Sequence, residues 1–408
     1  MKNAKNSLAL LFALTLAAAA LGAEAPMCTI TLDAITNGSI TIQPPLPENM
    51  QVPTGTELTV KATPAAGYAL DCIYHIGVGN QGRMYYENAS PEWKISIDGN
   101  KHLGASFIEQ KALEGFTVKN DIVFAQPGVK KLKYDVFSPN NAKNLPCIII
   151  IHGGGWSVNN EDVMRGLARE LARGGTYVVV SADYRWIRTG DGDPTPVTMA
   201  NIIEDVYGAI VHVQEHAAEY GADPTRLGVT GDSAGGHLSA AAINFADRIG
   251  DQGFGIKTGV YEFKPTYLPK GKSIDQVRKE VVTALKAAAP SYGVFSEQAL
   301  GRNAGSQGEA LKAVAPQSNI PNIKERAVPQ FLLRGTVDNL IQDAAVQSYA
   351  DALKAAGQRA EYVQVPGAAH AFLDWKPDAR TKATFYRFGV PYSAKMKEFF
   401  DSIFYPKP

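Results

Sequence analysis

The sequence predicts an α/β fold in which a mostly parallel, doubly wound sheet follows a small all-β domain. Three observations support this prediction. From about residue 115 onward, short apolar runs alternate with segments of helical periodicity, which is typical of parallel strands joined by helices. Between residues 28 and 107, short stretches alternate polar and apolar residues and are separated by turn residues. The length of 408 residues is sufficient for two or three domains.

Residues 1–25 are predicted to be a secretory signal peptide. Lys2 and Lys5 precede the apolar stretch 8–21, and small residues follow at positions 23 and 25. This stretch is short for a membrane span, which makes an uncleaved anchor the weaker alternative, and no other stretch is a membrane candidate. We therefore expect a secreted or periplasmic protein with no membrane span after removal of the signal.

Residues 26–109 are predicted to form the small all-β domain. Its predicted strands share a polar–apolar alternation and are Thr29–Leu32, Ser39–Ile42, Leu58–Lys61 and Lys94–Ile97. The segments that resemble the internalin-type bacterial repeat, here in one copy, are Gly38–Thr41, Thr59–Pro64, Gly67–Tyr68 and Ala105–Phe107. The resemblance implies a spacer or attachment module.

Two features of this domain leave alternatives open. Tyr85, Tyr86 and Trp93 either form a sugar-binding platform or fill the core, and core filling is the commoner role of such aromatic residues. Cys28 and Cys72 fall in the same domain, and an oxidising compartment would permit a disulfide between them.

A linker is predicted at residues 108–114, and the α/β domain at 115–408. Its predicted strands are 116–124, 132–137, 146–151, 177–182, 227–230, 330–334 and 360–365, the first two antiparallel. Its predicted helices are 161–173, 199–220, a segment beginning at 234, one within 274–285, and 344–356. The segment 254–316 interrupts the alternation and is rich in Gly, Pro and Ser. It is either an elaborated crossover or, as we favour, a cap that takes part in substrate selection.

The motif Gly231-Asp232-Ser233-Ala234-Gly235 follows the predicted strand 227–230 and precedes a helix-forming segment. A serine in so tight a turn is forced toward a strained backbone, which costs about 1–3 kcal/mol, and the glycines avoid side-chain collisions. Such a turn exposes the hydroxyl, and the helix N-terminus favours negative charge beside it. Ser233 is therefore the predicted nucleophile, while Asp232 is expected to support the turn rather than to react.

The apolar run 146–151, with Cys147 as a core residue, is typical of a buried parallel strand. It leads into His152-Gly153-Gly154-Gly155-Trp156. Consecutive glycines let the backbone approach a ligand closely and direct its amides toward it. A loop of this kind can stabilise the oxyanion that forms when a serine attacks an acyl group. His152 is expected to brace the loop.

A serine nucleophile needs a general base and an acid that orients the base. His370 remains once the histidines of the N-terminal segment, the glycine loop and the predicted helices are set aside, and it follows a predicted strand. Asp338 also follows a predicted strand, which gives the chain order Ser, Asp, His. Asp343, which is interpreted as a helix N-cap, and Asp374, which lies close in sequence to His370, are the competing acids.

Together these residues resemble the α/β-hydrolase superfamily, and within it the hormone-sensitive-lipase-like and carbohydrate-esterase branches. The shared motifs are His152–Trp156, Asp183–Arg185, Gly231–Gly236, Asp338 and His370. The resemblance runs from about Gly115 to the C-terminus. It implies a catalytic triad of Ser233, Asp338 and His370 and oxyanion donors at Gly154, Gly155 and Ala234. Arg334 stands where relatives often have histidine, and 254–316 has no counterpart from which acyl-pocket residues could be inferred.

We expect a secreted serine esterase that removes acetyl or other small acyl groups from glycans or small esters. Kynurenine-formamidase-like enzymes have a similar glycine loop, which keeps peptidase or amidase activity as an alternative. A non-catalytic adhesion or glycan-binding protein is the third reading. The formal net charge of zero and the lack of a basic cluster argue against nucleic-acid binding. No Cys/His cluster has zinc-site spacing, so no metal and no cofactor are expected, and the sequence indicates no oligomeric state.

Overall fold

The computed structural model describes residues 25–77 and 85–407, so residues 1–24 of the predicted signal peptide lie outside it. The chain divides into two compact units between Ile108 and Glu109. Part of the predicted linker is regular structure, because the last strand of the first unit, β8, ends at Glu109 and a 3-10 helix spans Gln110–Leu113. Among the described residues, no helix is both long and apolar enough to cross a membrane.

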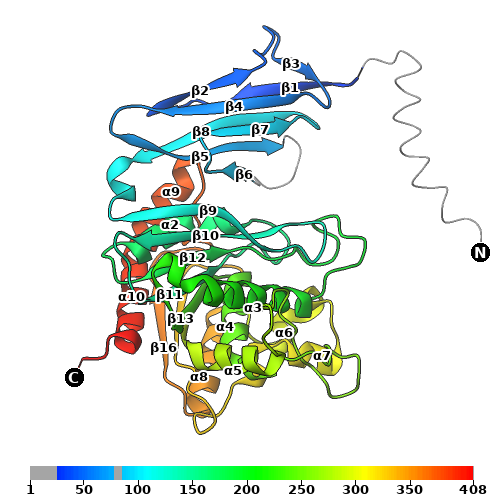
Figure 1. The fold of residues 1–408 in the computed structure, drawn as a ribbon, viewed down its shortest axis with the longest axis vertical. Helices are drawn as coiled ribbons and strands as arrows, with labels where there is room; N and C mark the ends of the chain where they lie inside the picture. Colours follow the sequence, from blue (N-terminus) through cyan, green and yellow to red (C-terminus); the bar gives the residue numbers. More distant parts are fainter. Residues whose placement is uncertain (1–24, 78–84, 408) are drawn as a thin grey trace, which may run out of the picture. The chain divides into compact units, whose positions relative to one another are not determined.

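The N-terminal unit contains a five-stranded sheet, ordered β3-β1-β8-β5-β6, and a three-stranded sheet, ordered β2-β4-β7 (Figure 1). Their strands are β1 (Met27–Leu32), β2 (Gly38–Gln43), β3 (Gln51–Pro53), β4 (Glu57–Pro64), β5 (Tyr68–Gly77), β6 (Tyr85–Asn88), β7 (Glu92–Ser96) and β8 (Lys101–Glu109). Apolar side chains from both sheets form one core, with Leu58 and Val60 of β4 and Ile73 of β5 fully buried. The alternating strands were predicted, whereas β5 and β8 were missed because their buried runs are nearly continuous.

The disulfide considered between Cys28 and Cys72 is not formed: both residues are buried free thiols. The strand order explains why. Cys28 lies on β1 and Cys72 on β5, and β8 separates these two strands. Two strand spacings place the strands about 9–10 Å apart, whereas a disulfide requires Cα atoms within about 7 Å. The thiol of Cys28 instead hydrogen-bonds to the hydroxyl of Thr54 at 3.2 Å.

The aromatic residues of this unit pack against one another. The rings of Tyr86 and Trp93 both stack on His75, with centroid distances of 4.8 and 5.1 Å. Tyr85 meets Tyr74 edge-on at 5.4 Å. These contacts favour the packing role over a sugar-binding platform.

The C-terminal unit is built on an eight-stranded sheet, ordered β16-β15-β14-β13-β11-β12-β10-β9. Its strands are β9 (Phe116–Ala125), β10 (Leu132–Pro139), β11 (Leu145–Ile151), β12 (Val178–Ala182), β13 (Ala222–Asp232), β14 (Leu285–Ser291), β15 (Gln330–Gly335) and β16 (Ala360–Val365). β9 and β10 are antiparallel to their neighbours, as predicted, and the remaining pairs are parallel.

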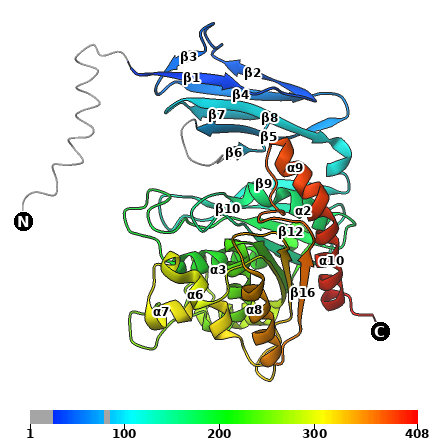
Figure 2. The same cartoon turned by 180° about the vertical axis from the view of Figure 1, so that it is seen from behind.

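Helices cover both faces of this sheet, and the side chains of β13 show how. Gly228 leaves room for Phe400, and the Thr230 hydroxyl contacts the Met396 sulfur at 3.4 Å, so these alternate residues face α10. Leu227 and Val229 point the opposite way, into the main core. Buried side chains of α3 and α4 belong to the same core, so these two helices lie on that second side, whereas α10 covers the other (Figures 1 and 2).

The helices in the described part of this unit are α2 (Arg165–Ala172), α3 (Met199–His216), α4 (Ala234–Asn244), α5 (Ile274–Ala284), α6 (Glu297–Leu300), α7 (Gly308–Ala313), α8 (Asp343–Ala355), α9 (Ala379–Thr384) and α10 (Val390–Phe404). Of these, α2, α3, α4, α5 and α8 agree with predicted segments, whereas α6, α7, α9 and α10 were not predicted.

The segment 254–316 differs most from its prediction. It supplies α5, as predicted, but then the central strand β14, which pairs in parallel with both β13 and β15. The interpretation of the whole segment as a cap is therefore wrong. β14 was missed because Ala287, Ala288 and Ala289 form its centre, and alanine favours helices and gives no period-two pattern.

Candidate active site

The serine turn has the strained geometry predicted for it. β13 ends at Asp232, α4 begins at Ala234, and Ser233 between them has φ 51° and ψ −112°. This φ lies in the left-handed region that side-chain-bearing residues rarely adopt. A side chain at Gly235 would overlap the carbonyl oxygen of Ile151 at the end of β11. The glycine therefore lets the turn pack directly against the neighbouring strand.

The structure brings Ser233, Asp338 and His370 together. The Nε2 atom of His370 lies 2.9 Å from Ser233 Oγ, and its Nδ1 atom lies 2.8 Å from Asp338 Oδ2. The three residues follow β13, β15 and β16, so all lie at the carboxyl ends of parallel strands, where open α/β sheets bind ligands. A neutral imidazole with its proton on Nδ1 donates to the carboxylate and accepts the serine proton at Nε2.

The Asp338 carboxylate is firmly held. Its Oδ1 atom accepts hydrogen bonds from the amides of Leu340 and Ile341 at 2.8 and 2.9 Å. Burial acts to raise the pKa of Asp338, but the hydrogen bonds from His370 and the two amides outweigh it and lower this pKa below its ordinary value. Asp338 is therefore ionised at neutral pH and can orient an imidazole.

Arg334, which departs from the family pattern, braces the loop that carries Asp338. Its guanidinium donates to the carbonyl of Ile341 through Nε at 2.6 Å and to the carbonyl of Asp338 at 3.0 Å. Arg334 is only 5% exposed. The side chain thus holds two carbonyl groups of this loop with charge-assisted hydrogen bonds.

The competing acids lie elsewhere. Asp343 is the first residue of α8 rather than its N-cap, which is Gln342. Its carboxylate accepts hydrogen bonds from the Tyr362 hydroxyl at 2.6 Å and the Gln364 amide at 2.8 Å. Asp374 is buried beside Asp232. Neither contacts His370 through a hydrogen bond in the described part of the chain.

The glycine loop follows β11 and adopts conformations that suit glycine. Gly154 has φ 118° and Gly155 has φ 58°, and a side chain at Gly154 would overlap the Val158 carbonyl. Within residues 25–77 and 85–407, neither Gly154 nor Gly155 donates its amide to a protein acceptor. Ala234 is the first residue of α4, where a helix leaves its amides without internal partners. All three predicted donors are therefore available to a ligand.

His152 braces the glycine loop, as predicted. It is fully buried, and its Nε2 atom lies 3.1 Å from Asp183 Oδ1. Its ring stacks on Tyr184 with a centroid distance of 4.1 Å, and the Tyr184 hydroxyl donates to the His152 carbonyl at 2.9 Å. The Asp183–Arg185 motif thus fixes the start of the loop from the neighbouring strand.

Sequence reasoning missed Tyr292, which supports the His370 loop. Its buried ring meets the His370 imidazole edge-on at 4.8 Å, and its hydroxyl accepts the Leu373 amide at 3.2 Å. Tyr292 directly follows β14. Had that strand been recognised, its carboxyl end would have marked Tyr292 as a residue near the site.

His237, on α4, joins the glycine loop to the segment after α7. Trp156 Nε1 donates to His237 Nδ1 at 3.3 Å, and His237 Nε2 lies 2.9 Å from the Val314 carbonyl. Burial lowers the pKa of His237 to about 4, so the ring is neutral and donates from Nε2.

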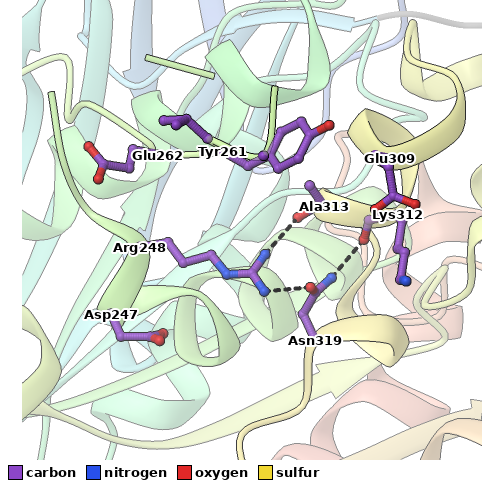
Figure 3. A pocket seen from close by; sticks show the side chains of 10 residues that line it. Asp247, Arg248, Tyr261, Glu262, Glu309, Lys312, Ala313 and Asn319 are labelled. Carbon is purple, nitrogen blue, oxygen red and sulfur yellow. Dashed lines mark hydrogen bonds between the residues drawn. The ribbon is translucent and has the colours of Figure 1, made fainter. Parts of the chain in front are cut away.

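A separate cavity of about 510 Å³ opens at the far end of α4 (Figure 3). Arg248 crosses it, donating to Asn319 Oδ1 at 2.6 Å and to the Ala313 carbonyl at 3.5 Å. Acidic and basic side chains both line it, including Glu262 and Lys312. Its lining residues, which fall between Asp247 and Asn319, include none of the serine turn, the glycine loop or the loops that carry Asp338 and His370. It is distinct from the site around the serine turn.

Comparisons with known proteins point to esterases. The BD-FAE family model matches residues 134–353. Carboxylesterase NlhH of Mycobacterium tuberculosis is 42% identical over 107 residues, which cover 26% of this chain and 31% of that protein. Esterase LipQ of the same organism is 29% identical over 249 residues, which cover 56% of this chain and 51% of LipQ. The chain thus spans 31% of the length of NlhH and 51% of that of LipQ.

Among solved structures, esterase 2 of Thermogutta terrifontis in a form phosphorylated by paraoxon is similar to this chain. The TM-score is 0.52 at 25% sequence identity, and the match covers 72% of this chain and 97% of that one. The C-terminal unit therefore has the α/β-hydrolase fold, as predicted.

Proposed function

Because the chain belongs to the BD-FAE family, we propose that it is a carboxylic ester hydrolase that acts through Ser233, His370 and Asp338. The observation that carries this proposal is the continuous hydrogen-bonded chain from Ser233 through His370 to Asp338. It lies beside a glycine loop with available amides, on a fold similar to that of named esterases.

The geometry supports acyl transfer in two steps. Ser233 Oγ attacks the ester carbonyl while His370 Nε2, at 2.9 Å, takes the hydroxyl proton. His370 then gives this proton to the departing alcohol, and Asp338 stabilises the imidazolium formed in between. The amides of Gly154, Gly155 and Ala234 stabilise the oxyanion. Water, activated by the same histidine, releases the acid from the acyl-enzyme and restores Ser233.

We propose further that the substrate is a small acyl ester, including acetyl or other acyl groups on extracellular glycans. The signal-peptide pattern of residues 1–25 and the separate β unit support this assignment. A screen of acetylated xylan, acetylated sialic acid, feruloyl esters and short-chain triglycerides tests it. Turnover of the triglycerides alone would contradict a glycan substrate.

We expect ester hydrolysis to exceed amide hydrolysis by at least about a hundredfold in kcat/KM, because an amine is a far poorer leaving group and needs stronger protonation. Matched p-nitrophenyl acetate and p-nitroacetanilide provide the measurement. Equal rates on the pair, or faster amide cleavage, would favour the amidase alternative, in which the same residues act on a different bond.

Replacing Arg334 with Gln should lower kcat about tenfold and leave KM nearly unchanged, because Asp338 then loses its fixed position relative to His370. The Lys variant should recover part of the loss, since it restores one charged donor. Arg359→Gln, which removes an exposed guanidinium paired with Glu361, is the matched control. A loss confined to KM would show that Arg334 acts on substrate binding instead.

A further inference from the structure

Two buried carboxyl groups meet behind the serine turn. Asp232 is the last residue of β13, and Asp374 lies in the loop that carries His370. Their side chains hydrogen-bond to each other, and they are 1% and 8% exposed. A hydrogen bond between two carboxyl groups requires a proton on one of them. The reaction described above uses neither group.

Asp232 and Asp374 are each also attached to a different part of the site. Asp232 Oδ1 accepts the Gly153 amide at 2.7 Å, immediately before the two predicted oxyanion donors of the glycine loop. Asp374 is tied to the His370 loop through its own amide, which donates to the Ala371 carbonyl at 3.2 Å. The pair therefore joins the serine turn, the glycine loop and the histidine loop at one point.

We propose that Asp232 and Asp374 are a positioning pair that shares one proton. The pair thereby keeps the glycine loop and the His370 loop in place relative to Ser233. This inference rests on the proposed esterase function. When the proton is lost, two adjacent carboxylates repel each other in a site with little water. The loops that carry Gly153 and His370 then separate, and the rate of acyl transfer falls.

The surroundings raise the pH at which this proton is lost above that of an ordinary carboxyl group. Burial raises the pKa of Asp232 well above its ordinary value, and the charge of Asp374 raises it further. Burial also raises the pKa of Asp374, against the opposing effects of Lys376 and His370.

Few other charged or titratable groups in the described residues face the two carboxyl groups. Lys376 Nζ lies 3.5 Å from Asp374 Oδ2 and is the only cation within ion-pairing distance of the pair in the described residues. The other ionisable groups that face it are the buried hydroxyls of Tyr184 and Tyr292, whose pKa values burial and these carboxylates raise well above 10. Both hydroxyls therefore stay neutral at neutral pH and add no charge beside the pair.

The test compares Asp374→Asn with Asp374→Leu across pH 6 to 10, with p-nitrophenyl butyrate as substrate and the uncatalysed rate subtracted. An asparagine amide donates to Asp232 at every pH. Asp374→Asn should therefore keep kcat within about threefold of wild type at pH 7 and lose the alkaline decline. Asp374→Leu, which cannot donate, should lower kcat about ten- to a hundredfold at all pH values. Asp251→Asn, an exposed site, is the control and should keep the wild-type profile.

Two outcomes overturn the inference: an alkaline decline in Asp374→Asn equal to that of wild type, or a wild-type kcat in Asp374→Leu. A second measurement does not depend on activity. A carboxyl pKa that is higher in the folded state makes unfolding easier as pH rises from about 4 toward that value. The unfolding midpoint of Asp374→Asn should therefore decrease less between pH 5 and 9 than that of wild type. If wild type hydrolyses no ester, the proposed function fails. The comparison of unfolding midpoints still shows whether Asp232 and Asp374 share a proton.

Discussion

Replacing Ser233 with alanine should abolish ester turnover while leaving the fold intact. The loss in kcat is expected to be about 10⁴- to 10⁶-fold, because no other group in the site can form the acyl-enzyme. Among the residues that the structure describes, the hydroxyl hydrogen-bonds only to His370, and the backbone strain at φ 51° is the same for alanine. The unfolding midpoint should therefore change little. Initial rates on p-nitrophenyl acetate and circular dichroism are the two measurements.

Ser239→Ala is the matched control for this prediction. Ser239 lies on the same helix α4, is fully buried, and donates to the Gly236 carbonyl at 3.2 Å. Its hydroxyl has no hydrogen bond to His370, so its removal should leave kcat near the wild-type value. A fluorophosphonate probe should label wild type and Ser239→Ala but not Ser233→Ala. Retained turnover in Ser233→Ala would show that a different nucleophile acts.

The sequence could predict the catalytic residues at the strand ends, because the residues next to each of them already indicate its role. A serine between glycines needs a tight turn whatever surrounds it, and the order Ser233, Asp338, His370 follows the order of the strands. The structure places their side chains within hydrogen-bonding distance of one another. The strain at Ser233 could be predicted for the same reason, since the turn geometry forces it.

Several other supporting contacts could not be predicted, because they join segments that only the strand order brings together. Asp374 was set aside as too close in sequence to His370, and its actual partner, Asp232, lies at the end of strand β13. Tyr292 was missed because it follows the alanine-rich strand β14, whose composition favours a helix. The disulfide was considered because Cys28 and Cys72 share a domain, whereas β8 between their strands keeps them apart.

Replacing Asp338 with asparagine should lower kcat about 10³- to 10⁴-fold, and the contacts of Asp338 show why. Oδ1 accepts two backbone amides, so an asparagine must keep its oxygen there and turn its NH₂ group toward His370. The imidazole then accepts at Nδ1 and carries its proton on Nε2. In that tautomer Nε2 cannot take the proton of Ser233. Kinetics with p-nitrophenyl acetate measure the loss.

Asp343→Asn separates this role from that of a nearby carboxylate. Asp343 begins α8, and its hydrogen bonds go to Tyr362 and Gln364 rather than to the imidazole. Its substitution should leave kcat within about threefold of wild type, as expected for a surface contact. A larger loss in Asp343→Asn than in Asp338→Asn would mean that the acid has been misassigned.

The acid stability of Asp338→Asn should change in a defined direction. The folded protein lowers the pKa of Asp338, because the hydrogen bonds from His370 and the two amides outweigh the effect of burial. The resulting stabilisation is complete above the ordinary carboxyl pKa of about 3.9 and is lost as pH falls through the lower folded value. Asparagine does not titrate. The free energy of unfolding of Asp338→Asn should therefore fall less than that of wild type between about pH 5 and pH 2. Urea titrations at each pH measure this difference, and parallel declines would show that the carboxylate gains nothing from its partners on folding.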